Sequence, residues 1–182
     1  MRILGIDPGT RKLGWAVYDD KLGIIEDSGC VEFEKKDVDI RLLSVKTAIY
    51  DLVYEISTIN NFKEFVGPVD LIAYEMMFSS GNSADAPLAV CAWMIRVEAK
   101  IAGVPVIGIP HTSAYKEVTG DGKSTKEEVQ AVLSSSFSYE FLSTDESDAA
   151  AVAIAAKTYT PKNKKPRVRK VQKASGDNLT KK

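Results

Sequence analysis

The chain of 182 residues is 45% hydrophobic and 27% charged, as expected of a single globular domain. No apolar run approaches the ~20 residues of a membrane-spanning helix, and the chain does not begin with the layout of a signal peptide. Cys30 and Cys91 are isolated and His111 is the only histidine, so a cysteine cluster and a multi-histidine metal site are both excluded. We expect a cytoplasmic protein without membrane contact, in which any metal is held by oxygen.

The net charge of −1 hides two regions of opposite charge. Residues 157–182 carry a charge of +9 and the preceding residues −10. The basic end has few large apolar residues, which favours a disordered arm that binds DNA phosphates through Arg167, Arg169 and Lys170. A solubilising tail without a partner is the alternative. We therefore divide the chain into a folded domain, residues 1–157, and a basic tail, residues 158–182.

The first predicted strand, Ile3–Asp7, is apolar on both faces and ends in a carboxylate. Pro8 and Gly9 then stop the strand and allow a tight reversal. Gly5 lies on the same face as Asp7, which predicts room for a bulky charged ligand beside the carboxylate. A common hairpin turn without further function is the simpler interpretation.

Further strands are predicted at Leu13–Asp19 and 24–34, which favours an antiparallel meander. Apolar residues at helical spacing follow from Leu42 to Ile59 and predict a long amphipathic helix. The next strand, 69–75, is again apolar on both faces and ends in Glu75. If it neighbours the first strand at ~4.8 Å, Asp7 and Glu75 could share a divalent cation.

A helix is predicted from about Ala84, with Pro87 in its first turn. Its segment from 86 to 95 has no charge, so we expect burial on both sides, against the sheet and against a second element or, preferably, a second subunit. A fifth strand, 104–109, leads into a short helix or turn at Pro110. The capping-box pattern Ser124–Glu127 then starts a helix through about Ser135.

The last predicted helix begins with two acids three residues apart, Asp145 and Asp148, which share one face. Helix capping is the simpler explanation, because Ser143 and Glu146 fit a capping box. Capping accounts for Glu146 but not for Asp148, which points into an alanine-lined face. The alanines allow this helix to approach closely whatever it covers.

Four acids thus end or begin predicted elements without histidine or cysteine partners: Asp7, Glu75, Asp145 and Asp148. Such hard oxygen ligands select Mg²⁺, with Mn²⁺ as a substitute, and their repulsion would be balanced by two ions per active site. Phosphodiester hydrolysis uses this arrangement, with one ion activating water and the other stabilising the leaving 3′-oxygen.

The chain resembles the RuvC-type Holliday junction resolvases of the ribonuclease H-like superfamily. The resemblance is carried by ILGIDPGTRKLGWAV at 3–17, IAYEMMF at 72–78 and DESDAAAVAIA at 145–155. It implies an RNase H-like α/β fold, with a five-stranded mixed sheet, three antiparallel strands first and helices on both faces. It also implies a homodimer that nicks opposed strands of a four-way junction with Mg²⁺, leaves 5′-phosphates and uses no small-molecule cofactor.

Position by position, the resemblance assigns the family's catalytic acids to Asp7, Glu75, Asp145 and Asp148. Phe78 looks like an aromatic residue that stacks on an unpaired base, and Asn82 lies in the same predicted DNA-binding loop. Lys116 and Lys126 are similar to basic residues that contact the scissile strand, although the match needs a one-residue shift near His111. The alternatives are a core position for Phe78 and solvated surface positions for both lysines.

Several other functions are compatible with parts of the pattern. A viral or mobile-element relative that cuts many branched DNAs would share these features, and so would an RNA-processing nuclease of the RNase H-like class. An actin-like ATPase or sugar kinase also resembles the first motif, but it needs two such domains and a longer chain. A junction-binding protein without activity would gain nothing from four carboxylates facing phosphates. We therefore expect a crossover junction endonuclease.

Overall fold

The computed structural model describes residues 1–34, 37–58, 68–76 and 86–160. Its strands and helices are β1 (Arg2–Asp7), β2 (Lys12–Asp19), β3 (Ile24–Glu32), α1 (Val38–Thr58), β4 (Leu71–Met76), α2 (Ala86–Ile101), β5 (Val106–Pro110), α3 (His111–Thr119), α4 (Lys126–Phe137) and α5 (Thr144–Ala156). The predicted α/β class is confirmed. No helix within the described ranges combines the length and apolar character needed to cross a bilayer.

The five strands form one mixed sheet in the order β3-β2-β1-β4-β5. The first three strands are antiparallel, as predicted, while β4 runs parallel to β1 and β5 parallel to β4. The first and fourth strands, whose proximity the sequence left open, are neighbours, with Ile6 opposite Tyr74. Because β1 and β4 are parallel, Asp7 and Glu75 end at the same edge of the sheet.

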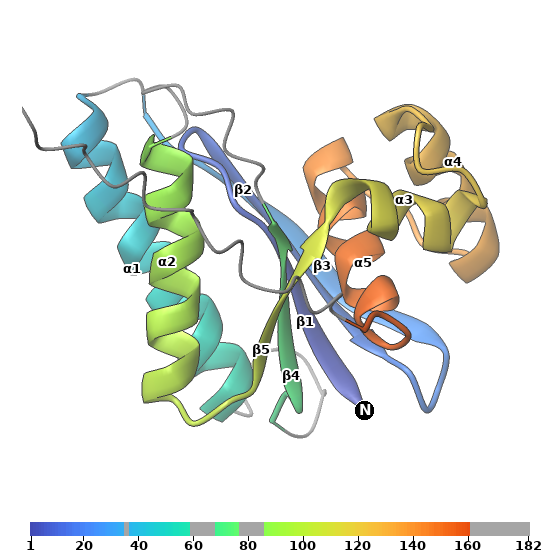
Figure 1. The fold of residues 1–182 in the computed structure, drawn as a ribbon, viewed down its shortest axis with the longest axis horizontal. Helices are drawn as coiled ribbons and strands as arrows, with labels where there is room; N and C mark the ends of the chain where they lie inside the picture. Colours follow the sequence, from blue (N-terminus) through green and yellow to red (C-terminus); the bar gives the residue numbers. More distant parts are fainter. Residues whose placement is uncertain (35–36, 59–67, 77–85, 161–182) are drawn as a thin grey trace, which may run out of the picture.

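Helices cover both faces of the sheet (Figure 1). Helices α1 and α2 pack on the face that carries Leu4, Ile6 and Ile72, whereas α3, α4 and α5 lie over the face that carries Ile3 and Ala73. The alternating side chains of β1 therefore enter two separate cores. This burial on both sides explains why the strand is apolar throughout.

Helix α5 lies unusually close to the centre of the sheet because two glycines face it. A Cβ atom on Gly5 would lie 2.0 Å from the carbonyl oxygen of Ala149, and one on Gly14 would lie 2.1 Å from that of Asp145. The prediction that Gly5 leaves room for a ligand was wrong, because the backbone of α5 fills that space. The close contact instead brings the first turn of α5 to the end of β1.

Helix α2 buries one side only within a single chain. Cys91, Ile95 and Ala99 face the core, while Trp93 is 61% exposed and Ile101 66% exposed on the outer side. The predicted burial on both sides is therefore not met by any element in the described part of this chain. The outer face of α2 therefore leaves apolar side chains exposed, beside the exposed Arg96 and Lys100.

The start of α4 differs from the prediction by one residue. Thr125, not Ser124, is the N-cap, and its side chain and that of Glu128 form the reciprocal capping box. This register makes Lys126 the first residue of the helix. The N-cap of α5 is Ser143, as predicted, and its hydroxyl accepts from the backbone N–H of Glu146.

Candidate active site

Three of the four predicted acids converge where β1 ends and α5 begins. One carboxylate oxygen each from Asp7, Asp145 and Asp148 lies within 4.8 Å of the others. Asp145 and Asp148 lie side by side because residues three apart share a helix face. The close packing of α5 on Gly5 and Gly14 sets the distance between these two acids and Asp7.

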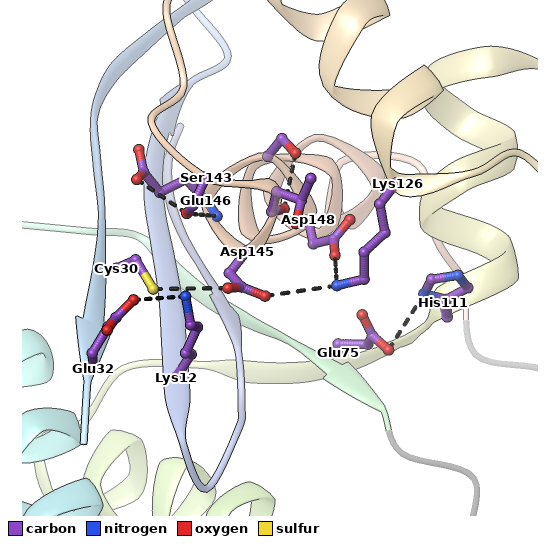
Figure 2. Close-up of polar contacts among 12 residues, drawn as sticks. Lys12, Cys30, Glu32, Glu75, His111, Lys126, Ser143, Asp145, Glu146 and Asp148 are labelled. Atoms are coloured by element: carbon purple, nitrogen blue, oxygen red, sulfur yellow. Dashed lines mark hydrogen bonds and ion pairs between the residues drawn. The ribbon is translucent and has the colours of Figure 1, made fainter. Parts of the chain in front are cut away.

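Glu75 lies beside this group but is not a member of it. Its Oε1 atom is 3.4 Å from Nδ1 of His111, the first residue of α3 (Figure 2). Burial raises the pKa of Glu75, and His111 opposes that rise. Glu75, the fourth acid, is therefore paired with a histidine that was not predicted as a site residue.

The cluster is electrostatically costly without a cation. Burial, followed by the charges of Glu75 and Asp148, raises the pKa of Asp7 from its ordinary 3.8 to about 8. Asp7 therefore holds a proton near neutral pH in the absence of metal. A divalent cation would stabilise the ionised form of Asp7 and offset the repulsion between the carboxylates.

Lys126 is the cation that faces the acids in the structure. Its ammonium group pairs with Oδ2 of Asp148 and lies 3.7 Å from Oδ1 of Asp145 (Figure 2). Burial lowers the pKa of Lys126, but the hydrogen bond to Asp148 and the negative charges of Asp148, Asp7 and Asp145 together outweigh burial and raise it. The predicted proximity of Lys126 to the site is thus present in the geometry.

Tyr115 supplies a contact that the sequence did not predict. Its hydroxyl donates a 2.6 Å hydrogen bond to Oδ1 of Asp148, and its ring lies 3.8 Å from that of His111. Burial raises the pKa of Tyr115, so the hydroxyl stays protonated and acts as the donor. The sequence feature that could have revealed Tyr115 is its spacing from His111, which puts both residues on one face of a helix.

Lys116 points elsewhere. Its side chain is exposed and forms no ion pair with a described residue. The remaining predicted DNA-binding residues lie outside the described ranges: Phe78, Asn82, Arg167, Arg169 and Lys170.

The donor set fits a hard divalent cation. Asp7, Asp145 and Asp148 offer carboxylate oxygens, which suit Mg²⁺ and Mn²⁺. The thiol of Cys30 is near, with Sγ 3.9 Å from Oδ2 of Asp145, but burial raises its pKa and keeps it neutral. The three carboxylates can hold a cation beside a phosphate group, and the ammonium of Lys126 can neutralise negative charge that develops on that phosphate.

Comparison with known proteins gives consistent relatives. The family model described as "Crossover junction endodeoxyribonuclease RuvC" matches residues 3–156. The protein of that name from Synechocystis sp. is 34% identical over 164 residues, which cover 85% of this chain and 89% of the relative. The one from Geotalea uraniireducens is 31% identical over 159 residues, covering 85% of this chain and 86% of the relative.

Solved structures share the fold. Thermus thermophilus RuvC superposes with a TM-score of 0.66 at 20% identity, covering 85% of this chain and 92% of that one. In complex with a Holliday junction substrate the same protein gives 0.67. The Fowlpox virus resolvase, in complex with substrate Holliday junction DNA, gives 0.54 at 14% identity and covers 86% of this chain and 96% of that one.

Proposed function

Because the chain belongs to the crossover junction endodeoxyribonuclease RuvC family, we propose that it resolves four-way DNA junctions by paired nicks that leave 5′-phosphates. The convergence of Asp7, Asp145 and Asp148 at the edge of the sheet carries the proposal. An inactive member of the family would have no need of a group of acids in which burial and mutual repulsion raise the pKa of Asp7 to about 8. We also propose that the protein acts in the cytoplasm.

The family's nucleases depend on a metal. We propose that the acidic cluster binds two Mg²⁺ ions per site and that Mn²⁺ can substitute for them. Bound divalent cations supply an activated water and stabilise the leaving 3′-oxygen. Asp7, Asp145 and Asp148 would hold them, with Glu75 completing the set after leaving His111. This assignment uses carboxylates that are already close, and it requires Glu75 to leave His111 and Asp148 to release Lys126.

The residues of the chain have distinct tasks in this proposal. Asp7 loses its proton when the site is loaded, since its raised pKa depends on neighbouring negative charge as well as burial. Lys126 moves from Asp148 to the scissile phosphate, where its ammonium stabilises charge in the transition state. Lys116, exposed on α3, contacts the DNA backbone.

We further propose that two chains pair through the outer face of α2, so that each subunit nicks one strand. Val90, Trp93 and Ile101 are exposed there and recur at helical spacing. Aromatic side chains are enriched in protein interfaces, and Trp93 is 61% exposed on this face. Phe78, Asn82 and the tail, residues 158–182, would add contacts to branched DNA.

A substrate panel tests the proposed function. Purified protein with Mg²⁺ is offered an immobile four-way junction, a three-way branch, linear duplex and an RNA hairpin. Paired nicks confined to the four-way junction would establish a resolvase. Cutting of every branched substrate would indicate a broader debranching nuclease, and cutting of RNA alone would indicate an RNA-processing enzyme.

The panel includes two matched variants. Asp7→Asn removes one charge of the acidic cluster without changing the size of the side chain. Asp51→Asn makes the same change at an exposed position of α1, on the opposite face of the sheet. The proposal requires loss of cutting in Asp7→Asn only.

A further inference from the structure

The carboxylate of Asp148 has a different partner on each oxygen. Tyr115 donates to Oδ1 at 2.6 Å, and Lys126 pairs with Oδ2. Tyr115 and Asp148 are each only 1% exposed, so solvent does not compete for the hydrogen bond between them. The tyrosine thus occupies one oxygen and leaves the other to a cation.

We propose that Tyr115 is a positioning residue that fixes the orientation of Asp148, so that Oδ2 alone is presented to the metal. The inference rests on the proposed metal site and deepens it. Tyr115 does not touch the substrate. It acts through Asp148, as outer partners of metal-binding carboxylates commonly do.

The position of Tyr115 is itself well defined. Its ring lies against His111, which contacts Glu75, and its backbone carbonyl accepts a 2.9 Å hydrogen bond from the Thr119 hydroxyl. The backbone of Asp148 is equally fixed, because α5 is seated against Gly5. The remaining freedom is rotation of the carboxylate, and the tyrosine hydroxyl removes it.

The same geometry explains why Lys116 does not reach the acids. Successive residues of a helix point about 100° apart, so two neighbours cannot both face the site. On α3 the buried, inward position belongs to Tyr115, and Lys116 is exposed. The contribution of α3 to the acidic cluster is therefore a neutral hydroxyl donor instead of a second ammonium.

The test is Mn²⁺ binding by titration calorimetry with the full chain. Tyr115→Phe removes only the hydroxyl and is expected to weaken Mn²⁺ binding by about tenfold or more, in the range seen when an outer partner is lost. In a junction-cleavage assay the Mn²⁺ concentration for half-maximal rate should rise by the same factor. The rate at saturating Mn²⁺ should change less.

Two controls accompany it. Tyr139→Phe removes a hydroxyl that accepts a 3.2 Å hydrogen bond from Ser28, away from the acids, and should leave Mn²⁺ affinity unchanged. Lys116→Ala should leave Mn²⁺ affinity unchanged as well. Weaker Mn²⁺ binding by Lys116→Ala, together with wild-type binding by Tyr115→Phe, would show that Lys116 and not Tyr115 supports the metal site.

Other outcomes separate this inference from the proposed function. Wild-type Mn²⁺ affinity in Tyr115→Phe would overturn the positioning role, even if the variant melted at a lower temperature, because the hydroxyl would then be purely structural. If Asp7→Asn bound Mn²⁺ as the wild type does, the proposed metal site would fail and the inference with it.

Discussion

Replacing Gly5 by alanine tests how firmly α5 and its two acids are fixed to the sheet. The added Cβ would lie 2.0 Å from the carbonyl oxygen of Ala149, whereas ordinary contact begins at 3.4 Å, so α5 must move by about 1.4 Å. Overpacking of a core costs about 1–3 kcal/mol, and we expect the upper end because the clash involves backbone. The movement also carries Asp145 and Asp148 away from Asp7.

Urea denaturation measures the first effect and single-turnover junction cleavage the second. A displacement of about 1 Å can reduce a rate by about 100-fold, and we expect a loss of that order in the folded fraction. Gly108→Ala is the control, since the atoms nearest to its added Cβ belong to the side chain of Tyr74, at 3.0 Å, and not to backbone. Wild-type stability and cleavage in Gly5→Ala would refute the argument that α5 is seated through this glycine.

Three further predictions concern charge and assembly. In the native, metal-free protein Asp7 keeps its proton up to about pH 8, whereas an unfolded aspartate loses its proton near pH 3.8. The free energy of unfolding should therefore fall as the pH rises between these values, by at most about 1.4 kcal/mol per pH unit. Calorimetry in EDTA should show this slope flattened in Asp7→Asn, and equal slopes would contradict it. Lys126→Met should bind Mn²⁺ more tightly, because Oδ2 of Asp148 loses its competitor, yet cleave about 100-fold more slowly; an unchanged rate would remove the lysine from the mechanism. Trp93→Glu should sediment as a monomer, whereas Leu142→Glu, at an equally apolar and 87% exposed position, should not.

Local patterns were sufficient to predict most of the fold. The apolar run of β1 and the acid at its end depend only on neighbouring residues, and the pairing of Asp145 with Asp148 follows from helix geometry. Parallel pairing of β1 with β4 did not follow from the sequence, since their shared pattern, apolar on both faces and leading to an acid, raised their proximity only as a condition. The strand pattern and the pairing of the two helix acids can be predicted because each depends on residues within one short segment.

Features that depend on packing between distant elements were missed. The role of Gly5 depends on α5, more than 130 residues later, and a sequence cannot distinguish a space for a ligand from a space for a helix. Tyr115 was overlooked because its partner, Asp148, lies on another helix. The side of α3 that faces the acids carries Tyr115 and not Lys116. Because the family match needed a one-residue shift near His111, the sequence alone did not determine which side this is.

The most direct test of the metal-dependent mechanism compares binding and cutting of one four-way junction by the wild type and Asp7→Asn, in Mg²⁺. We predict that Asp7→Asn binds the junction at least as tightly as the wild type, since it lacks one negative charge near the phosphates, and makes no paired nicks. Paired nicks at the wild-type rate in Asp7→Asn would contradict the assignment of the acidic cluster as the catalytic centre.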